Sequence, residues 1–159
     1  MNKIALRDRI VAQLRTELAL QTRAAQLSRE EAISEESKPE NQYDMHSQEA
    51  AYLAEGQARL AAEIAENIAL YEGLTIPAVP PDGRVALGAV VAVEHGGRKT
   101  WYFIGPRAGG LELEHEGTTV LVLTPQSPLG RELIGKRVTD SVRVQTRTGF
   151  VTHHIAAVE

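Results

Sequence analysis

The chain has 159 residues, a net charge of −4 and no cysteine. This length accommodates one ordinary domain, or one small domain with an extended appendage. The acidic balance argues against a general nucleic-acid binder, which would carry a basic surface to neutralise phosphates, so we expect any contact with nucleic acid to be indirect. The lack of cysteine excludes disulfides, thiolate metal sites and a cysteine nucleophile.

The sequence predicts a cytoplasmic protein that makes no contact with membranes. Its apolar runs fall short of the roughly 20 residues that a membrane-spanning helix needs. Residues 1–5 are not followed by the apolar core of a signal peptide. A composition without cysteine also suits a reducing compartment.

Residues 1–73 are predicted to form an antiparallel α-helical coiled-coil hairpin. Before Gly73 the segment contains no proline except Pro39 and no glycine except Gly56, and good helix formers dominate it. Two apolar stripes with helical spacing can bury only against each other, which places the tip near residues 35–44. The stripes comprise Leu6, Ile10, Leu14, Leu18, Leu53, Leu60, Ile64, Ile68 and Tyr71.

The composition changes after residue 73. Residues 74–84 contain three prolines and indicate a stiff linker. Residues 85–159 favour a small, mostly antiparallel β domain with one short helix, which Ser127 can cap, Pro128 can start and Gly135 can end. The predicted strands cover residues 85–94, 100–104, 111–115, 118–124, 141–147 and 150–158. The fold class is therefore α+β.

The segment 127–140, Ser-Pro-Leu-Gly-Arg-Glu-Leu-Ile-Gly-Lys-Arg-Val-Thr-Asp, is followed by an alternating strand. It resembles the C-terminal signature of the bacterial GreA/GreB-type transcript-cleavage factors. Those factors have an N-terminal coiled coil and a C-terminal FKBP-like domain, the same order that periodicity indicates here. The resemblance covers essentially the whole chain, and it implies that residues 85–159 are an FKBP-like, polymerase-docking domain.

The resemblance also implies a partner and a mechanism. Members of this family bind RNA polymerase at the mouth of its secondary channel and insert the coiled coil, so that acids at the tip approach the catalytic Mg²⁺. The polymerase then cleaves a backtracked transcript, because two metal ions flanking a phosphodiester need hard oxygen ligands. On this view the chain is not an enzyme. It is a monomeric, trans-acting cofactor with no cofactor of its own in isolation and only indirect contact with nascent RNA.

The family's tip pattern is Asp, two residues, Glu and Asn, and it falls here on Ser37, Glu40 and Asn41. Glu40 is therefore the candidate Mg²⁺ ligand, shared with the polymerase active site, while Ser37 stands where the family has an aspartate. Ser37 and Glu40 also match a helix capping box, a purely structural role that needs no metal. An aspartate at position 37 would cap as well, so both interpretations stay open.

The missing carboxylate has two candidate replacements, Glu36 and Asp44. Asp44, with Tyr43 one place earlier, stands where the family usually has an aromatic residue. Our hypothesis is that one of the two carboxylates substitutes for the aspartate; the alternative is a solvated acidic tip. The candidate cleavage residues are then Glu40, Asp44 and Glu36, and the tip-supporting residues are Ser37, Asn41 and Tyr43.

The short predicted helix and the residues just after it supply the candidate polymerase-binding residues Leu129, Arg131, Lys136 and Arg137. The alternatives are ordinary surface charge for the three cations and core packing for Leu129. His153 and His154 are neighbours in a predicted strand and point to opposite faces, so the two together are not expected to chelate one metal ion.

Two further function classes compete with transcript cleavage. The first is a modulator that occupies the channel without supporting cleavage, which the loss of the aspartate at position 37 favours. The second is an FKBP-like prolyl isomerase or chaperone, although the few aromatic residues of the β domain do not predict a complete pocket. A hairpin that dimerises with another copy is a weaker third alternative, because its outer faces are charged and polar.

Overall fold

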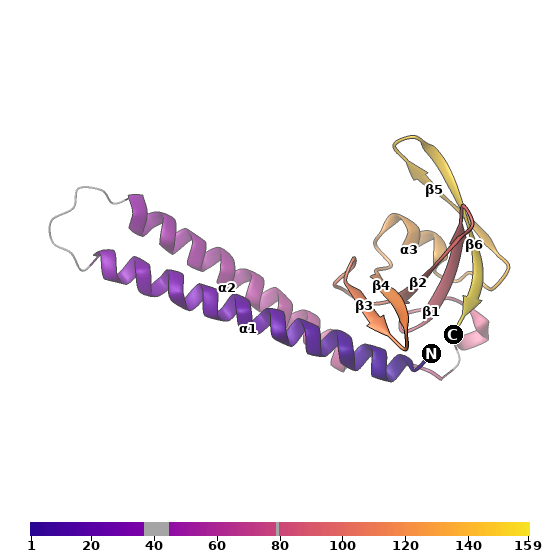
Figure 1. Cartoon of the computed structure of the whole chain (residues 1–159), viewed down its shortest axis with the longest axis horizontal. Coiled ribbons are helices and arrows are strands. Elements are labelled where there is room, and N and C mark those ends of the chain that lie inside the picture. The colour runs from indigo at the N-terminus through magenta and orange to yellow at the C-terminus, as the bar shows by residue number, and fades with distance from the viewer. Residues whose placement is uncertain (37–44, 79) are drawn as a thin grey trace. The chain divides into compact units, whose positions relative to one another are not determined.

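A computed structural model describes residues 1–36, 45–78 and 80–159, without the side chains of residues 35, 36, 45–47 and 81. The chain divides into two compact units. The hairpin unit is Val11–Ala69, and the β unit combines Met1–Ile10 with Leu70–Glu159. Both ends of the hairpin thus belong to the β unit, whereas the sequence places the boundary at residue 73. Figure 1 labels the elements of each unit.

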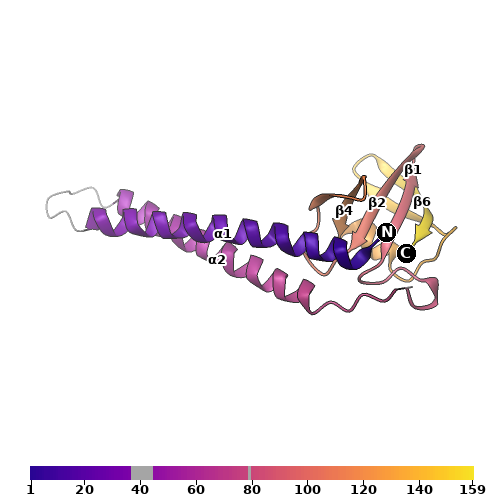
Figure 2. The same cartoon turned by 60° about the horizontal axis from the view of Figure 1, so that its bottom comes forward.

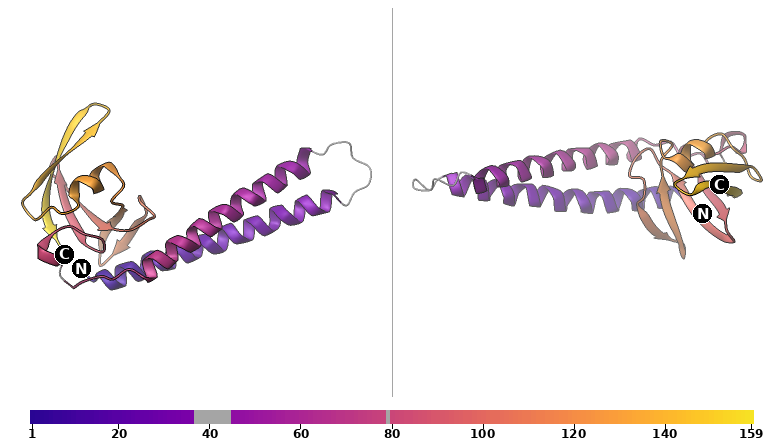
Figure 3. Two further views of the ribbon diagram at one scale, coloured as in Figure 1. Left: turned by 180° about the vertical axis from the view of Figure 1, so that it is seen from behind. Right: turned by 90° about the horizontal axis from the view of Figure 1, so that it is seen from above.

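Two long helices, α1 (Lys3–Glu36) and α2 (Met45–Glu72), make up the predicted hairpin. They run side by side in every view (Figures 2 and 3). Within the hairpin unit the buried apolar residues are Val11, Leu14, Ala32, Ala50, Ile64 and Ile68. None of the described helices is both long and apolar enough to cross a membrane.

The seam on α2 differs from the predicted stripe. Leu53 and Leu60, both assigned to the stripe, are exposed. The contact instead includes Gln57, whose side-chain oxygen accepts a hydrogen bond from the buried Ser28 hydroxyl at 3.0 Å. The prediction was wrong here because leucines outweigh alanines in a hydrophobic count, whereas two helices approach most closely where side chains are small.

The β unit is built on one six-stranded sheet with the order β3-β4-β2-β1-β6-β5. The strands are β1 (Val90–His95), β2 (Arg98–Ile104), β3 (Glu112–His115), β4 (Thr118–Leu123), β5 (Ser141–Thr146) and β6 (Gly149–Val158). Four neighbouring pairs are antiparallel. The pair β2·β4 is parallel, with Trp101 opposite Val120, so the sheet is mixed.

The first strand begins at Val90, five residues later than predicted. A 3-10 turn, η1 (Pro81–Gly83), is followed by irregular backbone, and Gly88 has a φ of 80°, outside the range of a strand. Val85 remains buried, and its backbone pairs with Gly135 and Lys136 instead of with a strand. An apolar residue pattern predicted burial here correctly but not the backbone conformation.

Each face of the sheet is covered. On one face, Val91, Ile104 and Ile155 form a buried cluster with Leu133 of the short helix α3 (Pro128–Leu133). On the other face, the ring of Phe103 stacks against Tyr71 at the end of α2, with centroids 6.3 Å apart. Because Tyr71 packs on this face of the sheet, the end of α2 belongs to the β unit.

Candidate functional site

Apart from Glu36, the predicted tip residues lie between α1 and α2 in the sequence. Ser37, Glu40, Asn41, Tyr43 and Asp44 lie outside the described residues, and Glu36 is the last residue of α1, without a described side chain. Their roles, including Mg²⁺ binding by Glu40, stay predictions. Elsewhere in the described chain, no group of three or more histidine or carboxylate side chains could hold a metal ion.

The described part of the candidate site is α3 and the turn that follows it. Ser127 is the N-cap, as the sequence predicts: its hydroxyl oxygen accepts a hydrogen bond from the Gly130 backbone N–H at 3.0 Å. The same hydroxyl donates to the Thr124 carbonyl at 2.8 Å. Pro128 occupies the first turn, where its missing N–H would have no partner in the helix. These local interactions fix where the helix begins.

Tight packing fixes how α3 lies on the sheet. A Cβ atom at Gly130 would lie 2.0 Å from the Thr124 carbonyl oxygen, so only glycine allows this approach. Leu133 is fully buried in the core cluster, and Leu129 is half-buried against it. One face of α3 is therefore anchored, and its opposite face reaches the surface.

The three predicted docking cations are exposed. The Arg131 Nε–H donates to the Gln126 carbonyl at 3.1 Å, which holds the base of that side chain against the start of the helix. The backbone N–H of Arg137 donates to the Asp140 carboxylate at 2.8 Å and shapes the turn after the helix. The cations thus project from a backbone that their own turn interactions hold in place.

Arg131 and Arg143 line the same shallow cleft of about 240 Å³. Arg143 is not among the docking residues predicted from the sequence. Arg143 lies on β5, with its guanidinium carbon 4.7 Å from the ring centroid of the exposed Phe150 on β6. Lys136 and Arg137 do not line this cleft. Strict alternation along β5 identifies Arg143 as solvent-facing, but only the packing of α3 against β5 brings it beside Arg131.

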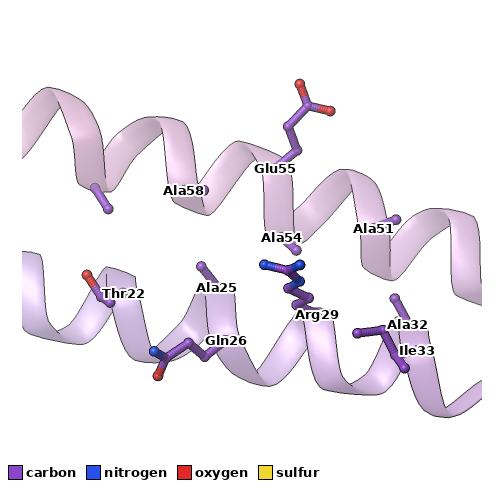
Figure 4. Close-up of a pocket in the computed structure, with 11 residues that line it drawn as sticks. Thr22, Ala25, Gln26, Arg29, Ala32, Ile33, Ala51, Ala54, Glu55 and Ala58 are labelled. Carbon is purple, nitrogen blue, oxygen red and sulfur yellow. The ribbon is translucent and has the colours of Figure 1, made fainter.

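A second, larger cavity of about 550 Å³ lies between the two helices of the hairpin unit. Alanines from both helices line it, with Thr22, Gln26 and Arg29 on α1 (Figure 4). The cavity arises because methyl side chains leave the space between the backbones unfilled.

Comparison with known proteins identifies the family to which the β unit is similar. Residues 80–159, which include the whole sheet and α3, match the family model described as "Transcription elongation factor, GreA/GreB, C-term". The chain belongs to the GreA/GreB family. The resemblance of residues 127–140 to the GreA/GreB signature is thereby confirmed.

Individual relatives extend the match beyond the GreA/GreB C-terminal region. Transcription elongation factor GreA of Nitrosococcus oceani is 26% identical over 166 residues, covering 99% of this chain and 98% of that protein. GreA of Legionella pneumophila (strain Corby) is 29% identical over 89 residues, which cover 54% of this chain and 51% of that protein. The crystal structure of Thermus aquaticus Gfh1 is 22% identical, with a TM-score of 0.40 over 93% of this chain and 92% of that one.

Proposed function

We propose that this GreA/GreB-family protein binds RNA polymerase and inserts its hairpin tip into the secondary channel, where it modulates or stimulates cleavage of backtracked transcripts. The observation that carries the proposal is the alignment with the Nitrosococcus oceani factor, which spans 99% of the chain and so includes the hairpin as well as the β unit. The two long helices provide an extended arm, and the β unit provides a separate docking module.

The docking surface in this proposal is the outer face of α3 with the turn that follows it. Arg131, Lys136 and Arg137 place three exposed positive charges here, against the exposed carboxylates of Glu132 and Asp140. Such a face suits an acidic protein surface, because opposite charges accelerate and orient the encounter. The exposed Ile134 supplies an apolar contact beside the charges. We expect the protein to act as a monomer, one copy per polymerase.

The tip would supply carboxylates and leave the reaction to the polymerase. Glu40 is the ligand offered to a Mg²⁺ ion of the polymerase active site, because Mg²⁺ prefers carboxylate and water oxygens. Glu36 or Asp44 would provide the second carboxylate. The protein would then be a trans-acting cofactor of the polymerase and no enzyme itself.

A second function is a channel-occupying modulator that does not support cleavage. The specific observation in its favour is Ser37, which stands where the family's pattern has an aspartate. A serine hydroxyl can still cap a helix, but it is a far weaker Mg²⁺ ligand than a carboxylate. Prolyl isomerisation has no such support, because neither cleft described above is lined by Trp101, Tyr102 or Phe103.

The deciding experiment uses a backtracked elongation complex of bacterial RNA polymerase with a labelled transcript. Wild-type protein should shorten the RNA, and Glu40→Ala should abolish that activity while still binding the polymerase. Ser37→Asp should enhance cleavage if one carboxylate is limiting. Binding without any shortening of the RNA would refute cleavage stimulation and leave the modulator.

Docking is tested separately by competition binding to the polymerase. Arg131→Ala and Lys136→Ala should each weaken binding, and the effect should shrink at high salt because exposed charges are screened. Arg98→Ala is the matched control, since this exposed cation on β2 lies outside the predicted docking set. Equal weakening by all three variants would mean that net charge, and not the α3 face, governs binding.

A further inference from the structure

Two histidines from adjacent strands lie together at one end of the sheet. His95 ends β1, and His153 lies on β6, its antiparallel neighbour. Their ring centroids are 5.0 Å apart, with the ring planes inclined at 46°. His95 is exposed and His153 is half-buried, so the pair is open to solvent on one side. The GreA/GreB assignment gives this pair no role.

The backbone contact of His95 selects one tautomer of its neutral ring. Its Nδ1 lies 3.0 Å from the Thr152 carbonyl oxygen. A carbonyl oxygen can only accept, so Nδ1 carries the proton and, in the neutral ring, Nε2 keeps a free lone pair. Metal-binding histidines are commonly held in this way, with the second ring nitrogen donating to a backbone carbonyl.

His153 lies half-buried in partly apolar surroundings. Burial is the main cause of its lowered pKa, and the neighbouring His95 and His154 lower it further. Val142, directly opposite on β5, is buried and supplies part of the apolar surroundings. His154 is not a competing ligand for the pair, because neighbouring residues of a strand point to opposite faces of the sheet.

The spacing of the two rings matches a shared ion. With metal–nitrogen bonds of about 2.0 Å and tetrahedral angles, the centroids of two coordinating imidazoles lie on the order of 5 Å apart. One charge on this face opposes a cation. Arg98 is opposite His95 across β1·β2, whereas Glu94 and Lys99, which lie 3.5 Å apart, point to the other face of the sheet.

We propose that His95 and His153 form a two-imidazole site for a borderline divalent transition-metal ion such as Zn²⁺ or Ni²⁺, with water completing the coordination. Imidazole nitrogens favour these ions, whereas Mg²⁺ favours oxygen ligands. A bound ion would link the end of β1 to β6. The site is separate from the tip and does not depend on the polymerase function.

The test is calorimetric titration of the full chain with Zn²⁺ and with Ni²⁺ at neutral pH. We expect one saturable event that His95→Gln and His153→Gln each weaken by at least about tenfold. His154→Gln is the matched control and should leave the affinity unchanged. Arg98→Gln should strengthen binding by removing a like charge. Mg²⁺ should not compete.

Either of two results would overturn the proposal. One is the lack of saturable binding of both ions to the wild-type chain. The other is binding that survives His95→Gln, which would place the ion elsewhere, for example on the acidic residues of the hairpin. His95 is exposed and outside the buried core, so this variant should keep the wild-type circular dichroism spectrum and remain informative even if His153→Gln perturbs folding.

Discussion

The β unit and the hairpin unit bury their large apolar side chains to different degrees. In the β unit, Val90, Phe103 and Leu133 are fully buried, because both faces of the sheet are covered. In the hairpin unit, Leu20 is 63% exposed and Tyr52 is 73% exposed, because each helix can bury only one stripe against the other. Elements with fewer buried contacts open more readily. The difference implies that the β unit is the firmly folded part and that the proposed tip is carried by the less stable one.

This comparison can be examined within a single molecule because the two units have different spectroscopic probes. Trp101 is the only tryptophan in the sequence and lies on β2, so its fluorescence reports on the β unit. Far-ultraviolet circular dichroism is dominated by α1 and α2. Urea unfolding followed by both signals separates the units, and the variants below run from the largest expected effect to the smallest.

Leu133→Ala should have the largest effect. Removing a fully buried leucine from the core cluster should lower the free energy of unfolding of the β unit by about 2–5 kcal/mol. The shift should appear in the Trp101 transition. The neighbouring Ile134→Ala is the control, because Ile134 is exposed and should lose about 1 kcal/mol or less. Equal losses would contradict the core assignment.

A matched pair of glycine variants contrasts the two units. Gly130→Ala should destabilise the β unit by about 1–3 kcal/mol, because the new Cβ meets the Thr124 carbonyl. Gly56→Ala, in the middle of α2 with open space around it, should stabilise the hairpin by up to about 1 kcal/mol through helix propensity. A loss of stability in the Trp101 transition for Gly130→Ala, with a gain in the circular dichroism transition for Gly56→Ala, would support the contrast between the two units. Stability changes of the same sign in both variants would contradict it.

Tyr71→Phe should remove about 1 kcal/mol, because the Tyr71 hydroxyl donates to the Arg107 carbonyl at 2.7 Å. It should also change the response to alkaline pH. Burial raises the pKa of Tyr71, so the folded state favours the neutral phenol. The resulting stability is fully present below the unfolded-state pKa of about 10 and is lost as pH rises above it.

The measurement is urea unfolding of both proteins at about pH 8 and about pH 11, on either side of the ordinary tyrosine pKa. Wild type should lose more stability over this interval than Tyr71→Phe. Burial also raises the pKa of Tyr102, so part of the alkaline loss should remain in the variant. Identical losses in the two proteins would show that Tyr71 does not contribute.

Ser28→Ala should have the smallest effect and should be confined to the hairpin. The variant loses the hydrogen bond to Gln57, worth about 1 kcal/mol. It gains about 0.5 kcal/mol from the higher helix propensity of alanine. A small shift in the circular dichroism transition with an unchanged Trp101 transition is expected. Movement of both transitions together would mean that the two units unfold as one.

Much of the local structure was predictable from the sequence. Helix formers over residues 1–73 predicted α1 and α2, because helical propensity and a periodic apolar stripe are properties of neighbouring residues. Ser127, Pro128 and Gly135 predicted the short helix, since capping acts within one turn. Alternation predicted most of the strands, and the signature at residues 127–140 predicted the family that the comparison later confirmed.

Long-range arrangement was not predictable in the same way. Nothing local indicates that β4 pairs in parallel with β2, because the pairing depends on where the β2–β3 connection places the chain. Nor does periodicity reveal that Tyr71 covers the second face of the sheet. Leu53 and Leu60 were wrongly assigned to the hairpin seam, because which residues meet there depends on both helices at once.

By itself, the sequence determined most of the elements and the capped helix, because these depend on residues within a few positions of one another. The tertiary structure alone decided which distant residues share a site. It brings Arg131 beside Arg143 by packing α3 on β5, and it brings His95 beside His153 by pairing β1 with β6. Residues far apart along the chain meet only when the sheet order and the strand register are fixed, and those depend on the packing of the whole unit.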